Sequence, residues 1–336
     1  MRSSLRDRVI ELLKQYQGSY VPQSYIHRSL SASKSRVSEI LSELEREGLI
    51  HRVSVGRSKI IYIHPGLSEK IPEKKERIIR LGIVYSSEYL FLKEFADKLR
   101  EEGLGLEVVV FRDGLVATRA LAEGFVDAAL SPLPGQLYLY PAYRTFEISL
   151  AGVRGGVRVV YAGEPGPVYS SMISTMDYAR HMVLAMKLVE SEETIYYRDP
   201  SEIRGISRGY IVTWHPLYIE LEKKGGRIIF DTDDLGVEFC CVLGISKTLS
   251  ESVRRIVERV YRSSLESYKR DPEKGIEYYS MITGIEREVL KSASREYVVA
   301  EDLDKRVVSK IINTFAPVIP SRTIFQEALT EISRES

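Results

Sequence analysis

The chain has 336 residues, 44% hydrophobic and 28% charged, and its 48 Lys and Arg nearly balance its 47 Asp and Glu. This length predicts two domains, or one small and one large, with ample room for a buried core. The composition is that of a globular protein and excludes disordered and fibrous architectures.

The sequence predicts a cytoplasmic protein that does not span a membrane. It contains no run of 18 apolar residues, and its N-terminus, MRSSLRDRVIELLKQY, is charged and amphipathic without the apolar core of a signal peptide. The only cysteines, Cys240 and Cys241, are adjacent in an apolar run. This pattern is typical of buried reduced thiols rather than of a disulfide framework.

Charge is distributed unevenly along the chain. Residues 1–65 hold 11 Lys and Arg against 6 Asp and Glu, which leaves 37 and 41 for the remainder. A basic head on a mildly acidic body is typical of a nucleic-acid-binding module joined to a domain that does not bind nucleic acid. Plain protein surfaces carry such an excess as well.

Apolar spacing in the head predicts three helices. The first covers residues from 5 onwards and ends at Gly18. The second runs over residues 22–30, because Pro is favoured in a first helical turn. The third begins after the N-cap Ser33 and ends at Gly48.

Two β-rich runs, residues 49–55 and 59–63, are joined by Gly56-Arg57-Ser58, which predicts a hairpin with a basic tip. Three helices followed by a hairpin resemble the winged helix-turn-helix domains of MarR-type and related prokaryotic regulators. The phrase SKSRVSEILSELEREGLIHR resembles their recognition helix and the strand after it. The resemblance implies that the third helix enters the major groove of double-stranded DNA and that the wing touches the backbone or minor groove.

The resemblance implies six DNA-binding residues. They are Ser33, Lys34, Ser35 and Arg36, which would face bases or phosphates, and the wing residues Arg57 and Lys59. Two alternatives stay open. Basic side chains opposite an apolar stripe are commonly solvated surface, and winged helices also serve as protein-interaction modules.

Residues 66–77 are charged and include a Pro, which predicts a linker. Beyond them strands and helices alternate, with strands at 80–84, 106–111 and 126–130 and helices at 88–101 and 116–123. This order predicts a parallel sheet with helices on both faces.

Two phrases of the body resemble type 2 solute-binding proteins, above all those for nitrate, sulfonate and taurine and the related pyrimidine-binding proteins of thiamine metabolism. RALAEGFVDAALSPLPG is similar to the run that ends their third strand. GYIVTWHPLYIELEKKGGRIIF, residues 209–230, is similar to their strand with a WxP motif and the helix and strand that follow. The resemblance covers about residues 78–316.

The two resemblances together imply an α/β protein in which a winged helix-turn-helix, residues 1–65, precedes a two-lobed type 2 periplasmic-binding-protein-like domain, residues 78–336. The second lobe would span about 164–235. In such a fold the ligand lies between the lobes, at the carboxyl ends of strands and the N-termini of helices. Four loops carry the implied ligand-binding residues, which are Tyr85, Ser86, Ser87, Ser131, Ser174, Thr175, Trp214 and His215.

Each of these residues has an ordinary structural explanation as well. Ser86, Ser87 and Thr175 are good helix N-caps. Trp214 is the only tryptophan and fits an apolar core, and His215 fits a structural role. Glu238 is expected near the hinge, where a buried acid would suit a cationic ligand, although a solvated Glu is the commoner case.

No motif predicts a catalytic residue, a metal site or a cofactor. The HExxH, CxxC, GxSxG, P-loop and dinucleotide patterns are absent. The run from Asp231 to Gly236 resembles a calcium loop, but Val242 stands where the twelfth position needs an acid. We therefore expect a binding protein rather than an enzyme.

Two functional hypotheses remain. The favoured one is a transcription regulator whose binding to double-stranded DNA responds to a small polar metabolite such as a sulfonate, an amino-acid-like acid or a thiamine precursor. We expect it to be a homodimer, and the amphipathic stretch at residues 324–332 offers a contact. The alternative is an enzyme of thiamine-pyrimidine biosynthesis, or a metabolite-binding protein, that uses the same cleft.

Overall fold

A computed structural model describes residues 5–16, 20–46, 49–55, 58–63, 77–191, 193–238, 240–300, 303 and 305–315. The chain divides into two compact units, of which the first contains residues 1–75 and the second nearly all of residues 76–336. The expected linker up to residue 76, the wing residue Arg57 and the amphipathic stretch at 324–332 lie outside the described residues. Among the described residues, none of the helices has both the length and the apolar composition that a membrane span needs.

The first unit combines three helices with a three-stranded antiparallel sheet of order β1-β3-β2. Its elements in chain order are α1 (Leu5–Lys14), β1 (Tyr20–Pro22), α2 (Gln23–Ser29), α3 (Lys34–Arg46), β2 (Ile50–Val55) and β3 (Ser58–Ile63). Apolar side chains from the helices and the sheet, such as Val9, Val37, Leu41 and Ile61, form one buried core. The three helices and the hairpin that the sequence predicts are present, and β1 is additional.

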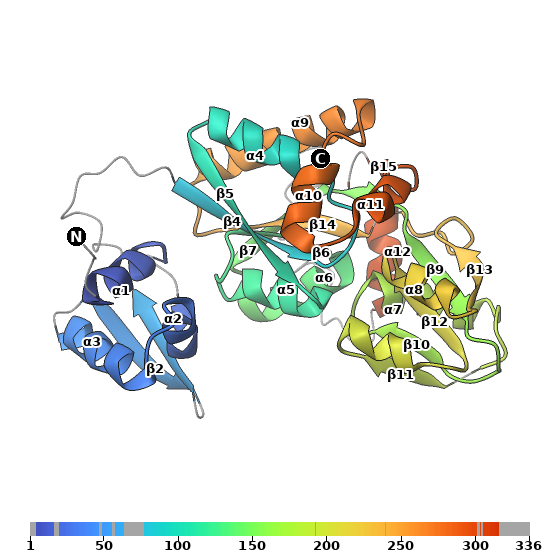
Figure 1. Cartoon of the computed structure of the whole chain (residues 1–336), viewed down its shortest axis with the longest axis horizontal. Coiled ribbons are helices and arrows are strands. Elements are labelled where there is room, and N and C mark those ends of the chain that lie inside the picture. Colours follow the sequence, from blue (N-terminus) through green and yellow to red (C-terminus); the bar gives the residue numbers. More distant parts are fainter. Residues whose placement is uncertain are drawn as a thin grey trace. The chain divides into compact units, whose positions relative to one another are not determined.

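The first lobe of the second unit is a five-stranded sheet of order β5-β4-β6-β14-β7 (Figure 1). The strands are β4 (Arg77–Val84), β5 (Leu104–Phe111), β6 (Ala128–Pro132), β7 (Phe146–Ala151) and β14 (Cys241–Ser246). β5, β4 and β6 are parallel, and β14 runs antiparallel to both of its neighbours. The connecting helices are α4 (Leu92–Glu101), α5 (Gly114–Ala122) and α6 (Leu133–Tyr143).

The second lobe repeats this arrangement in a sheet of order β11-β10-β12-β9-β13. The strands are β9 (Val157–Tyr161), β10 (Val168–Ser171), β11 (Thr194–Tyr197), β12 (Tyr210–Trp214) and β13 (Arg227–Asp231). Three strands are again parallel and β9 is antiparallel to its neighbours. The helices are α7 (Thr175–Ala185), the 3-10 helix η2 (Pro200–Gly205) and α8 (Leu217–Lys223). The second sheet therefore covers residues 157–231 and begins earlier than the expected position 164.

Two segments connect the lobes. The first leads from β7 through β8 (Val153–Arg154) to β9, and β8 pairs with β15 (Val298–Val299). Gly156 follows β8 with φ +71°, and a Cβ atom there would lie 2.0 Å from the Tyr297 hydroxyl, so only glycine fits. The second segment returns from β13 to β14 and includes Cys240.

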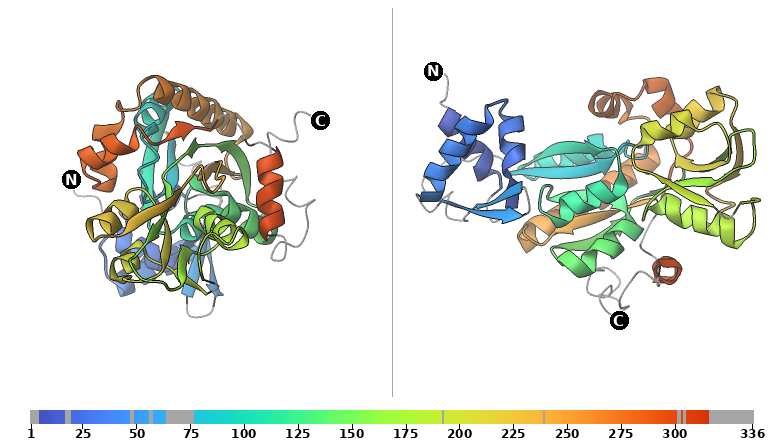
Figure 2. Two further views of the ribbon diagram at one scale, coloured as in Figure 1. Left: turned by 90° about the vertical axis from the view of Figure 1, so that its right-hand side faces the viewer. Right: turned by 90° about the horizontal axis from the view of Figure 1, so that it is seen from below.

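The C-terminal helices complete the body. They are α9 (Glu251–Arg270), α10 (Ile276–Thr283), α11 (Arg287–Ala293) and α12 (Lys305–Phe315). α9 packs along α4 of the first lobe, whereas α12, drawn in red, contacts α6 of the first lobe and α7 of the second (Figure 2).

The structure corrects two expectations about the first lobe. The helix expected at 88–101 begins only at Leu92, so Glu88 lies in the loop after β4. Ser131, expected in a loop, lies at the end of strand β6, and helix α6 begins directly after that strand. The residues Pro134 and Pro141 within α6 are more typical of a loop than of a helix. Pro134 occupies the first helical turn, where its missing N–H has no intrahelical partner to lose.

Candidate functional site

A small cavity of about 20 Å³ lies between the two lobes, with room for about one water molecule or a single ion. Four of its lining residues stand at the carboxyl ends of parallel strands: Val84 ends β4, Pro132 ends β6, Ser171 ends β10 and Trp214 ends β12. This is the position where open α/β sheets bind ligands. The remaining lining residues are Ser86, Glu88, Gly114, Ser174, Thr175, Met176, Cys240 and Cys241.

The lobes are closed around this cavity. Trp214 at the end of β12 donates its indole N–H to the carbonyl oxygen of Tyr85, in the loop after β4, at 2.8 Å. Beside it, the backbone N–H of Ser87 donates to the carbonyl oxygen of His215 at 3.2 Å. These bonds join the first lobe to the second, and every residue that lines the cavity is buried.

The structure brings four of the eight expected ligand residues to the cavity: Ser86, Ser174, Thr175 and Trp214 line it. Ser174 also caps α7, because its hydroxyl accepts from the backbone N–H groups of residues 176 and 177 at 3.1 and 3.2 Å. The Thr175 hydroxyl donates to the carbonyl oxygen of Cys240 at 2.6 Å. At the start of α7, Ser174 therefore both caps the helix and lines the cavity.

The other four expected residues, Tyr85, Ser87, Ser131 and His215, do not line the cavity. Ser131 is fully buried inside the first lobe, where its hydroxyl pairs with the Thr118 hydroxyl at 2.9 Å and the Gln136 amide at 3.1 Å. The Ser131 side chain is thus occupied by core hydrogen bonds.

His215 occupies a buried position outside the cavity. Its Nε2 lies 3.2 Å from the Ser292 hydroxyl, and its ring packs edge-on against the rings of Tyr218 and Tyr297. Burial, and then the nearby Arg158 guanidinium, lower the pKa of His215 to about 4. A neutral, packed imidazole fits the structural role that the sequence left open for this residue.

Glu88 is the only charged side chain among the described residues that line the cavity. It is 1% exposed, and neither carboxyl oxygen has a hydrogen-bond partner in the described part of the chain. Burial raises the pKa of Glu88 to about 7, an effect that its polar neighbours Tyr89, Cys241 and Cys240 reduce. A buried carboxyl without partners is costly for folding, and its position at a cleft makes Glu88 a candidate functional residue.

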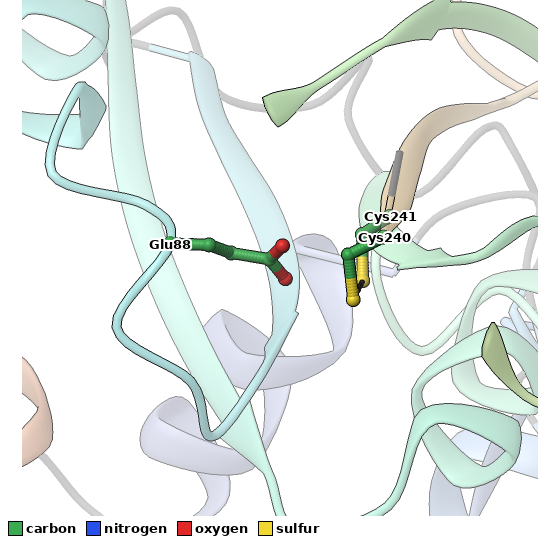
Figure 3. A group of neighbouring side chains, drawn as sticks. All are labelled: Glu88, Cys240 and Cys241. Atoms are coloured by element: carbon green, nitrogen blue, oxygen red, sulfur yellow. Dashed lines mark hydrogen bonds between the residues drawn. The ribbon is translucent and has the colours of Figure 1, made fainter. Parts of the chain in front are cut away.

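Cys240 and Cys241 face Glu88 across the cavity. Both are free thiols, as the sequence predicts, and their Sγ atoms are 4.0 Å apart. One carboxylate oxygen and the two sulfur atoms all lie within 4.8 Å of one another. Figure 3 shows the Glu88 carboxylate pointing toward the two sulfur atoms. Burial, followed by the neighbouring Cys240 thiol and Glu88, raises the pKa of Cys241 well above its usual value.

Glu88, Cys240 and Cys241 are not predicted as a group. The sequence predicts a helix at Glu88 and buried thiols at the two cysteines, and nothing in it shows that these two distant segments meet. The adjacency of the cysteines in a chain with no other cysteine was the one available signal.

At the starts of α7 and α5, backbone N–H groups near the cavity already have side-chain partners. Ser174 caps α7, and a carboxylate oxygen of Asp113 accepts from Val116 N at the start of α5 at 2.9 Å. An incoming anion would find these backbone donors used, and it would meet the carboxylate of Glu88. The cavity therefore favours a cation or a hydrogen-bond donor over an anion.

A larger cavity of about 640 Å³ lies beside α12. Its lining includes Arg154, Thr175, Glu238 and Lys310. The Glu238 side chain is exposed. Of the two alternatives for this residue, it is therefore the solvated glutamate and not a buried acid near the hinge. Thr175 lines both cavities, which places them next to each other.

The expected DNA-binding residues of the first unit are exposed where the structure describes them. Ser33, Lys34, Ser35 and Arg36 stand at the start of α3, and Lys59 lies on β3. The backbone N–H of Arg36 donates to the Ser33 hydroxyl at 3.4 Å, which supports the predicted N-cap, and the Arg36 guanidinium pairs with Glu39 at 2.8 Å.

Comparisons with known proteins bear on the two units separately. A family described as "Domain of unknown function (DUF7343)" matches residues 3–64. No curated protein matches the chain. Among solved structures, the alkanesulfonate-binding protein SsuA from Xanthomonas axonopodis pv. citri bound to MOPS is similar, with a TM-score of 0.62 and 15% identity over 77% of this chain and 99% of that one.

Two further structures show the same likeness. The ligand-binding component of an ABC-type import system from Staphylococcus aureus with zinc bound has a TM-score of 0.60 and 14% identity, over 75% of this chain and 98% of that one. The Candida albicans CA3427 gene product, titled as exhibiting the generic periplasmic binding protein structural fold, has a TM-score of 0.58 and 12% identity, over 77% and 96%. The second unit therefore has the two-lobed α/β fold of type 2 periplasmic-binding-protein-like domains.

Proposed function

We propose that the second unit is a receptor that binds a small ligand in the cavity between its lobes. One observation carries the proposal: the cavity lies at the carboxyl ends of four parallel strands and holds the buried carboxyl of Glu88 without a hydrogen-bond partner among the described residues. The proposed receptor binds its ligand without turning it over, so the ligand recovered after incubation should be chemically unchanged.

The ligand that fits this cavity presents a positive charge or hydrogen-bond donors to Glu88. A cationic group would stabilise the carboxylate and lower its pKa again. Sulfonates and amino-acid-like acids place an anionic group beside that carboxylate, and the lining described here supplies no Lys, Arg or His to balance it. Of the classes expected from the sequence, a thiamine-precursor-like base with amino groups fits better than a sulfonate.

The test is a fluorescence titration, because Trp214 is the only tryptophan and lines the cavity. Ligands of both signs, namely aminopyrimidines, thiamine precursors and alkanesulfonates, are added to the full chain, and thermal shift serves as a second readout. E88Q should weaken the binding of a cationic ligand by about tenfold or more, since hydrogen bonds to charged groups contribute about 1.5–3 kcal/mol. E107Q, the same change at an exposed position of β5 that lines neither cavity, is the control. Equal affinity in wild type and E88Q would contradict the proposal.

A second function, regulation of transcription, is favoured by the first unit. Its three helices and antiparallel sheet have the order of a winged helix, and the start of α3 exposes Ser33, Lys34, Ser35 and Arg36. In this proposal the first unit binds double-stranded DNA, and closure of the lobes around a ligand changes that affinity by about 1–3 kcal/mol. By linkage, DNA changes the affinity for the ligand by the same factor.

The DNA test uses the full chain and a mixed-sequence duplex over a range of salt concentrations. A K34A/R36A double variant should bind more weakly and show a smaller salt dependence. R46A, which removes one exposed charge at the far end of α3, is the control. Salt-independent binding by the wild type, or unchanged affinity and salt dependence in the double variant, would reject DNA recognition by this helix and leave the receptor function untouched.

A homodimer in the cytoplasm belongs to this second proposal. Two copies would present two heads to two half-sites of DNA. Light scattering at micromolar concentration with and without DNA measures the stoichiometry, and a monomer in both conditions would contradict it. Reduced thiols at the cavity suit a reducing compartment.

A further inference from the structure

Three metal-ligating side chains converge in the cavity between the lobes. Glu88 comes from the loop after β4, Cys240 from the segment that returns from the second lobe, and Cys241 from the first position of β14 (Figure 3). All three are buried, at 1%, 8% and 3% exposure. The Glu88 carboxyl has no hydrogen-bond partner among the described residues and is directed at both sulfur atoms.

The spacing of the donors suits a tetrahedral ion. Two thiolates bound to zinc at about 2.3 Å stand about 3.8 Å apart in a tetrahedral site. The two Sγ atoms here are 4.0 Å apart, and the carboxylate oxygen lies within 4.8 Å of both. Small side-chain rotations of Glu88 would bring its oxygen to a bonding position.

The size of the cavity points to the same class of ligand. A volume of about 20 Å³ in the closed state holds an ion directly, whereas an organic ligand needs the lobes to stand further apart. The ionisable groups of the lining also favour a cation, because they are the Glu88 carboxyl and the two thiols. Two sulfur donors select a thiophilic ion over magnesium or calcium, which prefer oxygen ligands.

We propose that Glu88, Cys240 and Cys241 form a binding site for a thiophilic divalent metal ion of the zinc class. This inference rests on the proposed receptor function, because it names the ligand class of the same cleft. Binding transfers the two thiol protons to solvent, so that both sulfurs bind as thiolates beside the carboxylate. Three protein donors leave a fourth tetrahedral position, which water or a ligand group fills from the cavity.

The site is placed where it can report closure of the lobes. Cys240 lies on a connecting segment, and its carbonyl oxygen accepts from the Thr175 hydroxyl at the start of α7 in the second lobe. Glu88 belongs to the first lobe. An ion bound by all three residues therefore acts on closure through the Cys240 segment and its contact with Thr175.

The experiment is a metal titration of the chelator-treated, reduced full chain. Zn²⁺ and Cd²⁺ should bind with one ion per chain in competition with a chromogenic chelator, whereas Mg²⁺ and Ca²⁺ should not compete. Cd²⁺ should produce the ultraviolet charge-transfer absorption of thiolate coordination. C240S/C241S should abolish that absorption, and E88Q should weaken binding by more than about 100-fold, since even changes around metal ligands cost 10–100-fold. E107Q, at an exposed position of β5 that lines neither cavity, should bind as wild type does.

The outcomes separate this inference from the receptor function. If an aminopyrimidine or another organic ligand changes Trp214 emission while Zn²⁺ and Cd²⁺ do not bind, the metal site is refuted and the receptor stands. If no ligand of either kind binds, both are refuted. Undiminished Zn²⁺ affinity in C240S/C241S would also refute the site. Circular dichroism checks the fold of each variant, and the charge-transfer band of the wild-type protein tests thiolate coordination without any substitution.

Discussion

Acid should destabilise the second unit through His215. The ring is 1% exposed, and Nδ1 has no hydrogen-bond partner among the described residues. Burial and then Arg158 lower the pKa of His215 from 6.5 to about 4, so the folded state excludes a proton that the unfolded chain binds between these two values. The stability that depends on a neutral His215 is therefore fully present above pH 6.5 and is lost as the pH falls toward 4.

The magnitude follows from the two pKa values. Their difference corresponds to about 3 kcal/mol at 1.36 kcal/mol per unit. About 2 kcal/mol of this should be lost between pH 7 and pH 4.5, where the unfolded chain is already protonated and the folded ring is still largely neutral. A loss of this size is a large fraction of the free energy of unfolding of an ordinary domain.

The assay is urea unfolding followed by Trp214 emission, for wild type and H215Q at both pH values. Gln cannot be protonated, so the wild type should lose about 2 kcal/mol more than H215Q on acidification. H181Q, which changes an exposed histidine of α7, should respond to pH as the wild type does. Parallel losses in wild type and H215Q would mean that the folded state protonates His215 normally, and the reasoning from burial would be wrong.

Three further predictions concern stability and DNA binding. D127N should lower the free energy of unfolding by about 3–5 kcal/mol in urea titrations. The reason is that Arg80 is 5% exposed and donates two hydrogen bonds of 3.0 Å to the Asp127 carboxylate, and unchanged stability would contradict a buried ion pair. G156A should lower the Tm in thermal unfolding more than G225A does. Both positions have positive φ, but only a Cβ atom at position 156 would lie close to other atoms, so equal losses of Tm would contradict this reason. R36A should reduce the salt slope of DNA binding by about one if the guanidinium meets a phosphate, as anisotropy titrations would show; an unchanged slope and affinity would exclude the contact.

Much of the fold follows from local patterns in the sequence. Strand β5 is a largely apolar run interrupted by Glu107, and β4 and β6 lie close to where the βαβ order predicts them. The N-cap Ser33 and the stop near Gly48 locate α3 within two residues. Helix α6 was missed because Pro134 and Pro141 resemble loop residues, although tertiary contacts in the first lobe hold this segment helical.

The site was predicted less completely than the fold. Sequence phrases locate strand ends, so Ser86, Ser174, Thr175 and Trp214 were expected near a cleft and do line the cavity. The same phrases do not show toward which face of the sheet a side chain points. For this reason Ser131 was expected at the cleft, although its side chain points into the core of the first lobe. The meeting of Glu88 with the cysteines depends on long-range topology, namely the return of β14 between β6 and β7, which no local pattern records.

The closed lobes have a consequence for timing. The bonds from Trp214 to Tyr85 and from Ser87 to His215 hold the two sheets together over a cavity whose lining residues are all buried. An occupant of that cavity leaves only after these bonds break, so its dissociation rate cannot exceed the rate at which the lobes separate. The residence time of the occupied state is therefore at least the time that the lobes take to separate, whatever the chemistry of the occupant. A receptor of this kind stays occupied for at least that time after its ligand is withdrawn. Its occupancy therefore averages out changes in ligand concentration that are faster than the opening of the lobes.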